Sequence, residues 1–195
     1  AVTTVDIEDR FDPDVTADVF DLRPSDLPNA DVVLVGHPCT MMSAAGNHDQ
    51  WDMDAREPTG ARAKDHVALV YPSLGLVHGI APEFWFVENP LSGRMRWILG
   101  PPTGAVTYCQ YGREYQKPTG LWGTHPPMDY RSCRAGKDCH QSNTEDDGTS
   151  AVASMDTDHA ERSKVPYKLS EAIREACDAA LDGETTEDAA LGDFV

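Results

Sequence analysis

Two short apolar runs stand out along the chain, and each stops abruptly in polar residues followed by a proline. The first is Val32–Val35, which lies between Asp31 and Gly36, and the second is Phe84–Val87, which runs into Glu88. Uninterrupted apolar runs of this kind, rich in β-branched and aromatic residues, are typical of strands that are buried on both faces of a parallel sheet. The pattern therefore predicts two core strands, the first of them central.

Helical periodicity is found in two other segments. Over residues 61–78 the apolar residues recur near helical spacing, which predicts a helix that is kinked or split at Pro72 and ended by Gly79. A closing amphipathic helix, ended by Gly183, carries its apolar residues on one face: Leu169, Ile173, Ala176, Cys177, Ala180 and Leu181. Shorter segments predict strands at Val2–Val5, Val15–Phe20, Gly104–Cys109 and Leu121–Gly123, and a helix within Ser92–Gly100. This order predicts an α/β fold with a mainly parallel sheet.

The chain has 195 residues, which is enough for one domain with a real core. We assign residues 1–183 to that domain and interpret residues 124–163, which show no periodicity, as an irregular insert or a small recognition loop. Residues 184–195 are expected to form an acidic flexible tail. Because the strand pattern begins almost at Ala1, we expect the domain to be incomplete at its N-terminus.

The charge is strongly negative and unevenly distributed. The formal net charge is −17, from 33 acidic and 16 basic residues, whereas residues 56–144 hold 10 basic and 7 acidic residues. Such an acidic surface is typical of a halophile or its virus and makes the chain a poor general binder of nucleic acid, although its basic middle can meet a phosphate backbone. We find no secretory signal and no apolar run of about 20 residues, and therefore expect a cytoplasmic protein. We also expect a monomer.

The five cysteines are consistent with reduced thiols in a reducing compartment. Cys133, Cys139 and His140 lie close together in the sequence and leave two interpretations open. One is a structural zinc site, but the five-residue gap is longer than usual and no second cysteine pair follows. The other is a loop with incidental thiols. We favour the loop, and therefore expect no metal.

The ends of the predicted strands offer candidate chemistry. In open α/β sheets ligands bind beyond the carboxyl ends of strands, where Cys39 can serve as a thiolate nucleophile and Glu88 as a proton donor or recognition group. Asp6 follows the first strand, where an acidic residue can hold ribose hydroxyls, and Asp18 can make another cofactor contact. The alternatives are an inert buried cysteine, a glutamate that caps a turn and ordinary surface acids.

Taken together, these residues resemble the DNA cytosine-5 methyltransferases, in particular small members encoded by viruses or prophages. Pro38-Cys39 after an apolar strand resembles the nucleophile motif of that family, and Glu88-Asn89 resembles its cytosine-binding motif. The remaining matches come in family order: Asp6 and Ile7 with the ribose-binding acid, Asp18 and Val19 with the adenine-contacting segment, Gln110 to Lys117 with the basic motif, and Val165-Pro166 with the last motif.

The resemblance implies a Rossmann-like fold that binds S-adenosylmethionine, with DNA as the partner and a place in DNA methylation or restriction-modification. Cys39 would attack C6 of a flipped cytosine, and Glu88 would hydrogen-bond its N3 and amine. Pro38, Asn89, Arg113 and Lys117 would contact the substrate. Asp6, Ile7, Asp18 and Val19 would contact the cofactor.

Two other functions remain open. One is a degenerate, non-catalytic relative that binds DNA or a protein partner, because function resides in sites and not in folds. The other is a cysteine hydrolase that uses Cys39. His37 is the nearest histidine that could act as its base.

Overall fold

The computed structural model describes residues 1–44, 48–134, 137–140 and 163–183. The predicted tail at residues 184–195 lies outside these residues, and so does most of the predicted insert. The described parts of the insert between residues 124 and 140 contain no helix or strand, as expected for an irregular segment.

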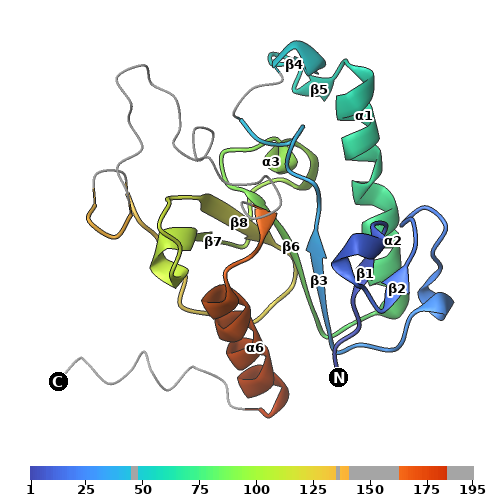
Figure 1. The fold of residues 1–195 in the computed structure, drawn as a ribbon, viewed down its shortest axis with the longest axis vertical. Coiled ribbons are helices and arrows are strands. Elements are labelled where there is room, and N and C mark those ends of the chain that lie inside the picture. The colour runs from blue at the N-terminus through green and yellow to red at the C-terminus, as the bar shows by residue number, and fades with distance from the viewer. Residues whose placement is uncertain (45–47, 135–136, 141–162, 184–195) are drawn as a thin grey trace.

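A four-stranded sheet organises the domain (Figure 1). Its strands are β3 (Val32–Gly36), β6 (Phe84–Pro90), β8 (Pro118–Trp122) and β7 (Gly104–Thr107), in the order β3-β6-β8-β7. The β3–β6 pair is parallel, whereas β8 is antiparallel to both β6 and β7. The protein is therefore mixed α/β, and the expected parallel arrangement holds for β3 and β6 but not for the pairings of β8.

The position of β3 corrects one prediction. We expected a central strand, but β3 lies at the edge of the four-stranded sheet among the described residues. Its apolar side chains are only partly covered, and Leu34 is 59% exposed. An apolar run alone does not reveal how many neighbours a strand has, because strand pairing depends on residues far away in the sequence.

The N-terminal segment forms its own two-stranded parallel ladder from β1 (Val5–Asp6) and β2 (Val15–Thr16). Both strands are shorter than predicted. The backbone leaves β2 soon after Thr16, and the Asp18 carboxylate accepts a hydrogen bond from the Phe20 N–H at 3.0 Å. Side-chain turns of this type compete with strand pairing. A small antiparallel ladder joins β4 (Trp51–Asp52) and β5 (Glu57–Pro58).

The helices largely follow the predicted periodicity. The first predicted helix is split into α1 (Ala61–Ala68) and α2 (Val70–Ile80), three residues before Pro72. Pro72 has no N–H to donate to the Ala68 carbonyl, which confirms the predicted interruption. The end of α2 is one residue later than Gly79, because Ala81 adopts a left-handed conformation with φ of 54°.

Two shorter predictions change more. The strand predicted to reach Cys109 ends at Thr107, and the chain continues as the 3-10 helix η4 (Tyr108–Tyr111). The predicted helix around residues 92–100 is the short α3 (Met95–Leu99), and the closing helix is α6 (Tyr167–Leu181). Further 3-10 turns are η1 (Asp9–Phe11), η2 (Pro24–Asp26) and η3 (His48–Gln50). Among the described residues, no helix is both long and apolar enough to cross a bilayer.

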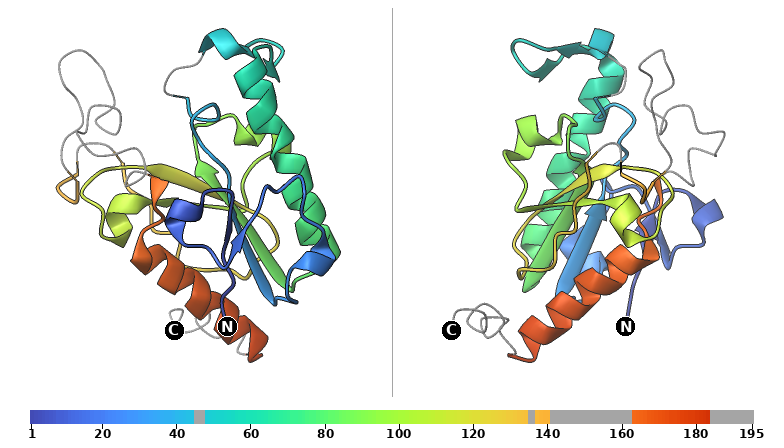
Figure 2. Two further views of the ribbon diagram at one scale, coloured as in Figure 1. Left: turned by 45° about the vertical axis from the view of Figure 1, so that its right-hand side comes forward. Right: turned by 90° about the vertical axis from the view of Figure 1, so that its left-hand side faces the viewer.

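Two apolar cores lie on opposite faces of the sheet, as the alternation of β6 requires. Figure 2 shows α6 on one side of the sheet and α1 and α2 on the other. Phe86 packs with η4 and α6, and Val87 packs with the side covered by α1, α2 and α3. The first core also contains Val106, Tyr108, Tyr111, Tyr115, Leu121, Leu169, Ile173 and Cys177. The second core also contains Met42, Trp51, Ala63, Val70, Met95 and Trp122. This layered packing fixes the carboxyl ends of β3 and β6 between two sets of helices.

Candidate active site

The parallel register of β3 and β6 brings the two predicted catalytic segments to one edge of the sheet. Gly36, the last residue of β3, pairs with Glu88, and Cys39 follows three residues later along the chain. Asn89 is fully buried, and its side-chain amide donates a hydrogen bond of 3.2 Å to the His37 carbonyl. This bond ties the loop that carries Cys39 directly to β6.

Side chains from other elements hold further carbonyls of the Cys39 loop, which we define as residues 37–43. His66 of α1 places its Nδ1 3.3 Å from the Pro38 carbonyl. The Trp51 indole N–H donates to the Met41 carbonyl at 3.1 Å. The loop also closes on itself, since the N–H groups of residues 42 and 43 donate to the Cys39 carbonyl at 3.0 and 2.7 Å. These contacts fix the backbone around the partly buried Cys39.

Arg94, which lies outside the Cys39 loop, forms several hydrogen bonds to the loop's carbonyl groups. It is only 2% exposed, and its guanidinium donates to the carbonyls of Met41, at 3.5 Å, and of Ser43. The same group lies over the ring of Trp51 at 5.3 Å, and its backbone N–H donates to the Met42 carbonyl at 2.7 Å. A buried cation that satisfies backbone carbonyls in this way orders the loop, because displacing it would leave a charge and several acceptors unpaired.

The Glu88 carboxylate is held by two residues that follow it in the chain. The Tyr108 hydroxyl donates to Glu88 Oε1 at 2.8 Å, and Lys117 Nζ lies 3.7 Å from the same oxygen. Both partners are buried, and the Lys117 ammonium also lies 4.5 Å from the centroid of the Tyr108 ring. Burial, and then the nearby carboxylate, raises the pKa of Tyr108, so its hydroxyl remains a donor. This arrangement fixes the orientation of the Glu88 carboxyl group in a largely enclosed position.

The predicted substrate contacts are distributed unevenly. Pro38, Asn89 and Lys117 all lie in the contacts just described. Arg113 instead donates from its guanidinium to the Lys164 carbonyl at 3.3 Å, toward the segment that leads into α6. Of the two predicted basic residues, Lys117 contacts Glu88, whereas Arg113 contacts the Lys164 carbonyl.

The predicted cofactor contacts come together at the carboxyl end of the β1–β2 ladder. Asp6 is paired with Thr16, and its carboxylate accepts the Glu8 N–H at 2.8 Å. The equivalent turn of Asp18 accepts the Phe20 N–H. Ile7 is exposed, whereas Val19 is partly covered. These carboxylates have acceptor capacity for hydroxyl groups, which is the chemistry that a ribose requires.

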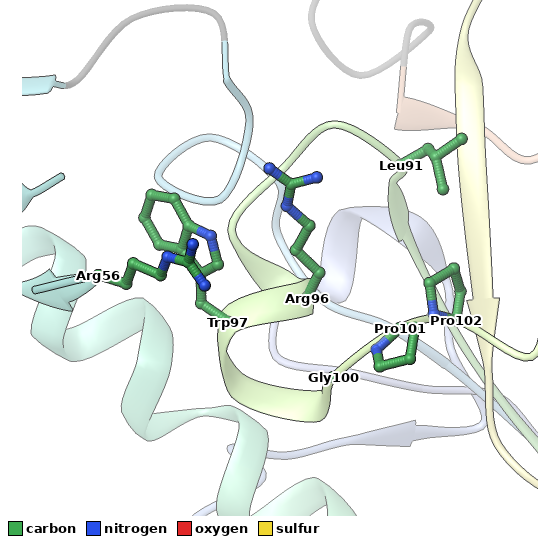
Figure 3. A pocket seen from close by; sticks show the side chains of 7 residues that line it. All are labelled: Arg56, Leu91, Arg96, Trp97, Gly100, Pro101 and Pro102. Carbon is green, nitrogen blue, oxygen red and sulfur yellow. The ribbon is translucent and has the colours of Figure 1, made fainter. Parts of the chain in front are cut away.

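A pocket of about 460 Å³ opens next to the end of β6 (Figure 3). Leu91 lines it directly after the last residue of β6, and α3 contributes Arg96 and Trp97. Arg56, from the turn between β4 and β5, completes its cationic wall. Two exposed arginines with an aromatic ring are suited to bind phosphates and bases.

Sequence patterns did not single out two residues that build this site. Arg94 and His66 both act on carbonyls of the Cys39 loop from other parts of the chain. The segment that contains Met95, Trp97, Ile98 and Leu99 carries two cations, Arg94 and Arg96. Only Arg94 is buried, and the sequence alone does not show which of the two finds buried acceptors.

A scan against models of known protein families and a search of curated proteins found no match to this chain.

Proposed function

We propose that this protein is a DNA cytosine-5 methyltransferase that uses S-adenosylmethionine. The observation that carries the proposal is the pair of adjacent strand ends, where a tightly held cysteine loop meets a carboxylate fixed by Tyr108 and Lys117. The chemistry needs a nucleophile and a hydrogen-bonding acid that approach one base from neighbouring positions.

In the proposed reaction the target cytosine leaves the duplex and enters the site at the ends of β3 and β6. The Cys39 thiolate forms a bond to C6, and Glu88 hydrogen-bonds N3 and the exocyclic amine, which stabilises the electron-rich ring. S-adenosylmethionine, when bound, supplies the methyl group to C5. A base then removes the C5 proton, and the bond between C6 and Cys39 breaks. Cys39 departs as a thiolate, and the product is 5-methylcytosine.

The residues at the end of the β1–β2 ladder fit the cofactor in chemical type. The carboxylates of Asp6 and Asp18 suit ribose hydroxyls, with Ile7 and Val19 beside them as apolar contacts. We expect Asp6→Ala to weaken S-adenosylmethionine binding by roughly 2 kcal/mol. Calorimetric titration of the two proteins measures this loss, and equal affinities would remove Asp6 from the cofactor site.

The cationic pocket supports DNA as the substrate. Exposed Arg56 and Arg96 line the pocket that opens next to the end of β6. In the proposed complex a phosphate backbone passes along this pocket. Replacing Arg96 with Ala should lower DNA affinity and reduce the slope of log K against log salt by about 1. Exposed Arg62 of α1 provides the control, and an equal loss in Arg62→Ala would contradict a local DNA contact.

Covalent trapping tests the proposal as a whole. Duplex DNA that contains 5-fluorocytosine should form a stable adduct in the presence of S-adenosylmethionine, because fluorine at C5 cannot leave as a proton does. Peptide mapping should place the adduct on Cys39, and Cys39→Ser should abolish it while Cys177→Ala, at a buried position in α6, retains it. An adduct on another cysteine would refute the assigned nucleophile. DNA binding without any adduct would favour the non-catalytic relative.

A further inference from the structure

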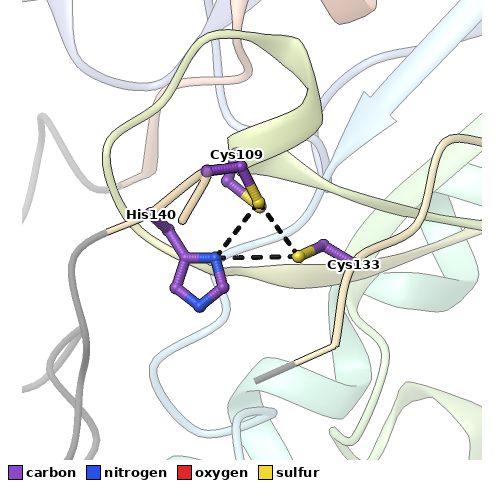
Figure 4. A group of neighbouring side chains, drawn as sticks. Cys109, Cys133 and His140 are labelled. Carbon is purple, nitrogen blue, oxygen red and sulfur yellow. Dashed lines mark hydrogen bonds between the residues drawn. The ribbon is translucent and has the colours of Figure 1, made fainter. Parts of the chain in front are cut away.

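Three cysteines and one histidine gather beside η4, away from the strand ends described above (Figure 4). One ligand atom from each of Cys109, Cys133, Cys139 and His140 lies within 4.8 Å of all the others. Cys109 belongs to η4, whereas the other three come from the described parts of the predicted insert. The sequence-based preference for incidental thiols considered only three of these four residues.

Three of four distances within this four-residue cluster are close to those of a tetrahedral metal site, and the fourth, between the sulfur atoms of Cys133 and Cys139, is shorter. The sulfur atoms of Cys133 and Cys139 lie 3.1 Å apart, and those of Cys139 and Cys109 lie 3.8 Å apart. His140 Nδ1 lies 3.6 Å from Cys133 Sγ and 3.4 Å from Cys139 Sγ. Tetrahedral zinc with its usual bond lengths places sulfur atoms about 3.8 Å apart and sulfur and nitrogen about 3.6 Å apart. A disulfide would require about 2.05 Å between sulfur atoms, much shorter than any of these distances.

The surroundings of the cluster are also those of a metal thiolate site. Gln110 donates its side-chain N–H to Cys139 Sγ at 3.2 Å. The backbone of Cys133 is fixed at both ends, since its N–H donates to Thr107 and its carbonyl accepts from Gln116. Hydrogen bonds of this kind orient ligands and stabilise thiolate charge. The adjoining surface carries Arg134 and Lys137, together with Asp138, and these cations offset the net negative charge of a zinc ion with three thiolates.

We propose that Cys109, Cys133, Cys139 and His140 bind one structural zinc ion. All four tetrahedral positions are filled by protein ligands, so the ion has no open position for catalysis. The ion joins Cys133, Cys139 and His140 to η4. Tyr108, which donates to Glu88, immediately precedes Cys109, and so the metal would stabilise the element that holds the proposed catalytic carboxylate.

Metal analysis of the full chain, purified without added zinc or a histidine tag, tests the proposal. We expect about one zinc ion per chain, measured by inductively coupled plasma mass spectrometry. Cobalt exchanged into the site should give the visible bands of a tetrahedral thiolate complex. Absorption spectroscopy at the zinc edge should report three sulfur ligands and one nitrogen.

Variants identify the ligands and separate metal binding from folding. Cys139 is exposed and His140 is 9% exposed, and Cys139→Ser and His140→Asn should each reduce zinc content at least tenfold at a fixed chelator concentration. Cys39→Ser is the matched control and should retain the metal. If Cys109→Ala proves insoluble, the two other variants still decide the question.

Zinc well below one equivalent in the purified protein, or zinc that all ligand variants retain, would overturn the proposal. Mapping of a Cys133–Cys139 disulfide in protein purified under reducing conditions would also overturn it.

Discussion

The N-terminal 36 residues and the strand ends beyond them are built very differently. No side chain in residues 1–36 is buried, whereas His37 begins a series of buried residues that includes Met41, Met42 and Trp51. Six of the large apolar side chains that the described residues expose lie in this first part: Val2, Val5, Ile7, Phe11, Phe20 and Leu34. The proposed catalytic machinery is thus held by a packed core, and the proposed cofactor contacts rest on local hydrogen bonds.

This difference teaches that the two halves of the proposed site depend on different forces. Around Cys39, contacts from β4, β6, α1 and Arg94 converge on one loop. Around Asp6, each side-chain hydrogen bond joins residues of the β1–β2 segment, such as the bond from the Thr4 hydroxyl to Asp14 at 2.8 Å. Such an element has little buried apolar area to stabilise it independently.

The largest expected effect is a contrast in amide exchange. Amides of β1 and β2 should exchange at least about a thousandfold faster than those of β6 and β8, because only the latter open through unfolding of the core. Hydrogen exchange read by mass spectrometry or NMR measures this directly. Similar protection in both ladders would show that the N-terminal segment is stabilised by contacts beyond its own hydrogen bonds, and the comparison would fail.

The second effect concerns Arg94. Arg94→Met should lower the free energy of unfolding by about 3 kcal/mol, since it removes the buried guanidinium that donates to the carbonyls of Met41 and Ser43. Urea denaturation measures this loss, and Arg96→Met, two residues away and exposed, is the matched control. Equal losses in the two variants would mean that the loop does not depend on the buried guanidinium.

His37 marks the boundary between the two regions and makes stability depend on pH. Burial lowers the pKa of His37 to about 4, below the usual 6.5. Above pH 6.5 the imidazole is neutral in both states; as the pH falls toward 4, only the unfolded state gains the proton, and folding loses up to about 3 kcal/mol. His37→Asn should flatten the stability profile between pH 6.5 and 4, whereas the exposed His78→Asn should keep the wild-type slope. Burial also lowers the pKa of His125, so some slope should remain.

The sequence was sufficient for features that are encoded locally. The apolar runs at Val32–Val35 and Phe84–Val87 became β3 and β6, and the missing N–H of Pro72 interrupted the helix. The edge position of β3 and the antiparallel pairing of β8 were not predictable in this way, because they follow from pairings between distant segments.

The same distinction applies to the candidate site. Cys39 and Glu88 could be identified because each follows an apolar run. Arg94 and Cys109 could not, since their roles arise only from contacts with distant residues. For Arg94 the contact is Met41, and for Cys109 the contacts are Cys133, Cys139 and His140. The acid at position 6 was identifiable, but the strand begins only at Val5 and includes Asp6, whose side chain is partly buried.

The smallest expected effect is on the Glu88 carboxylate. Tyr108→Phe removes the hydroxyl that donates to Glu88 at 2.8 Å and retains the ring that packs in the core. We expect a loss of about 1 kcal/mol in the free energy of unfolding, which is the typical value for one buried hydrogen bond.

Tyr111→Phe is the control, because the Tyr111 hydroxyl donates to the Asp129 carbonyl at 2.7 Å on the same core but does not contact Glu88. The two variants should therefore be similarly destabilised. Only Tyr108→Phe should slow formation of the 5-fluorocytosine adduct, by about fivefold to tenfold, because Glu88 alone loses its positioning donor. Equal adduct rates in the two variants would show that the Tyr108 hydroxyl stabilises the fold without positioning the carboxylate.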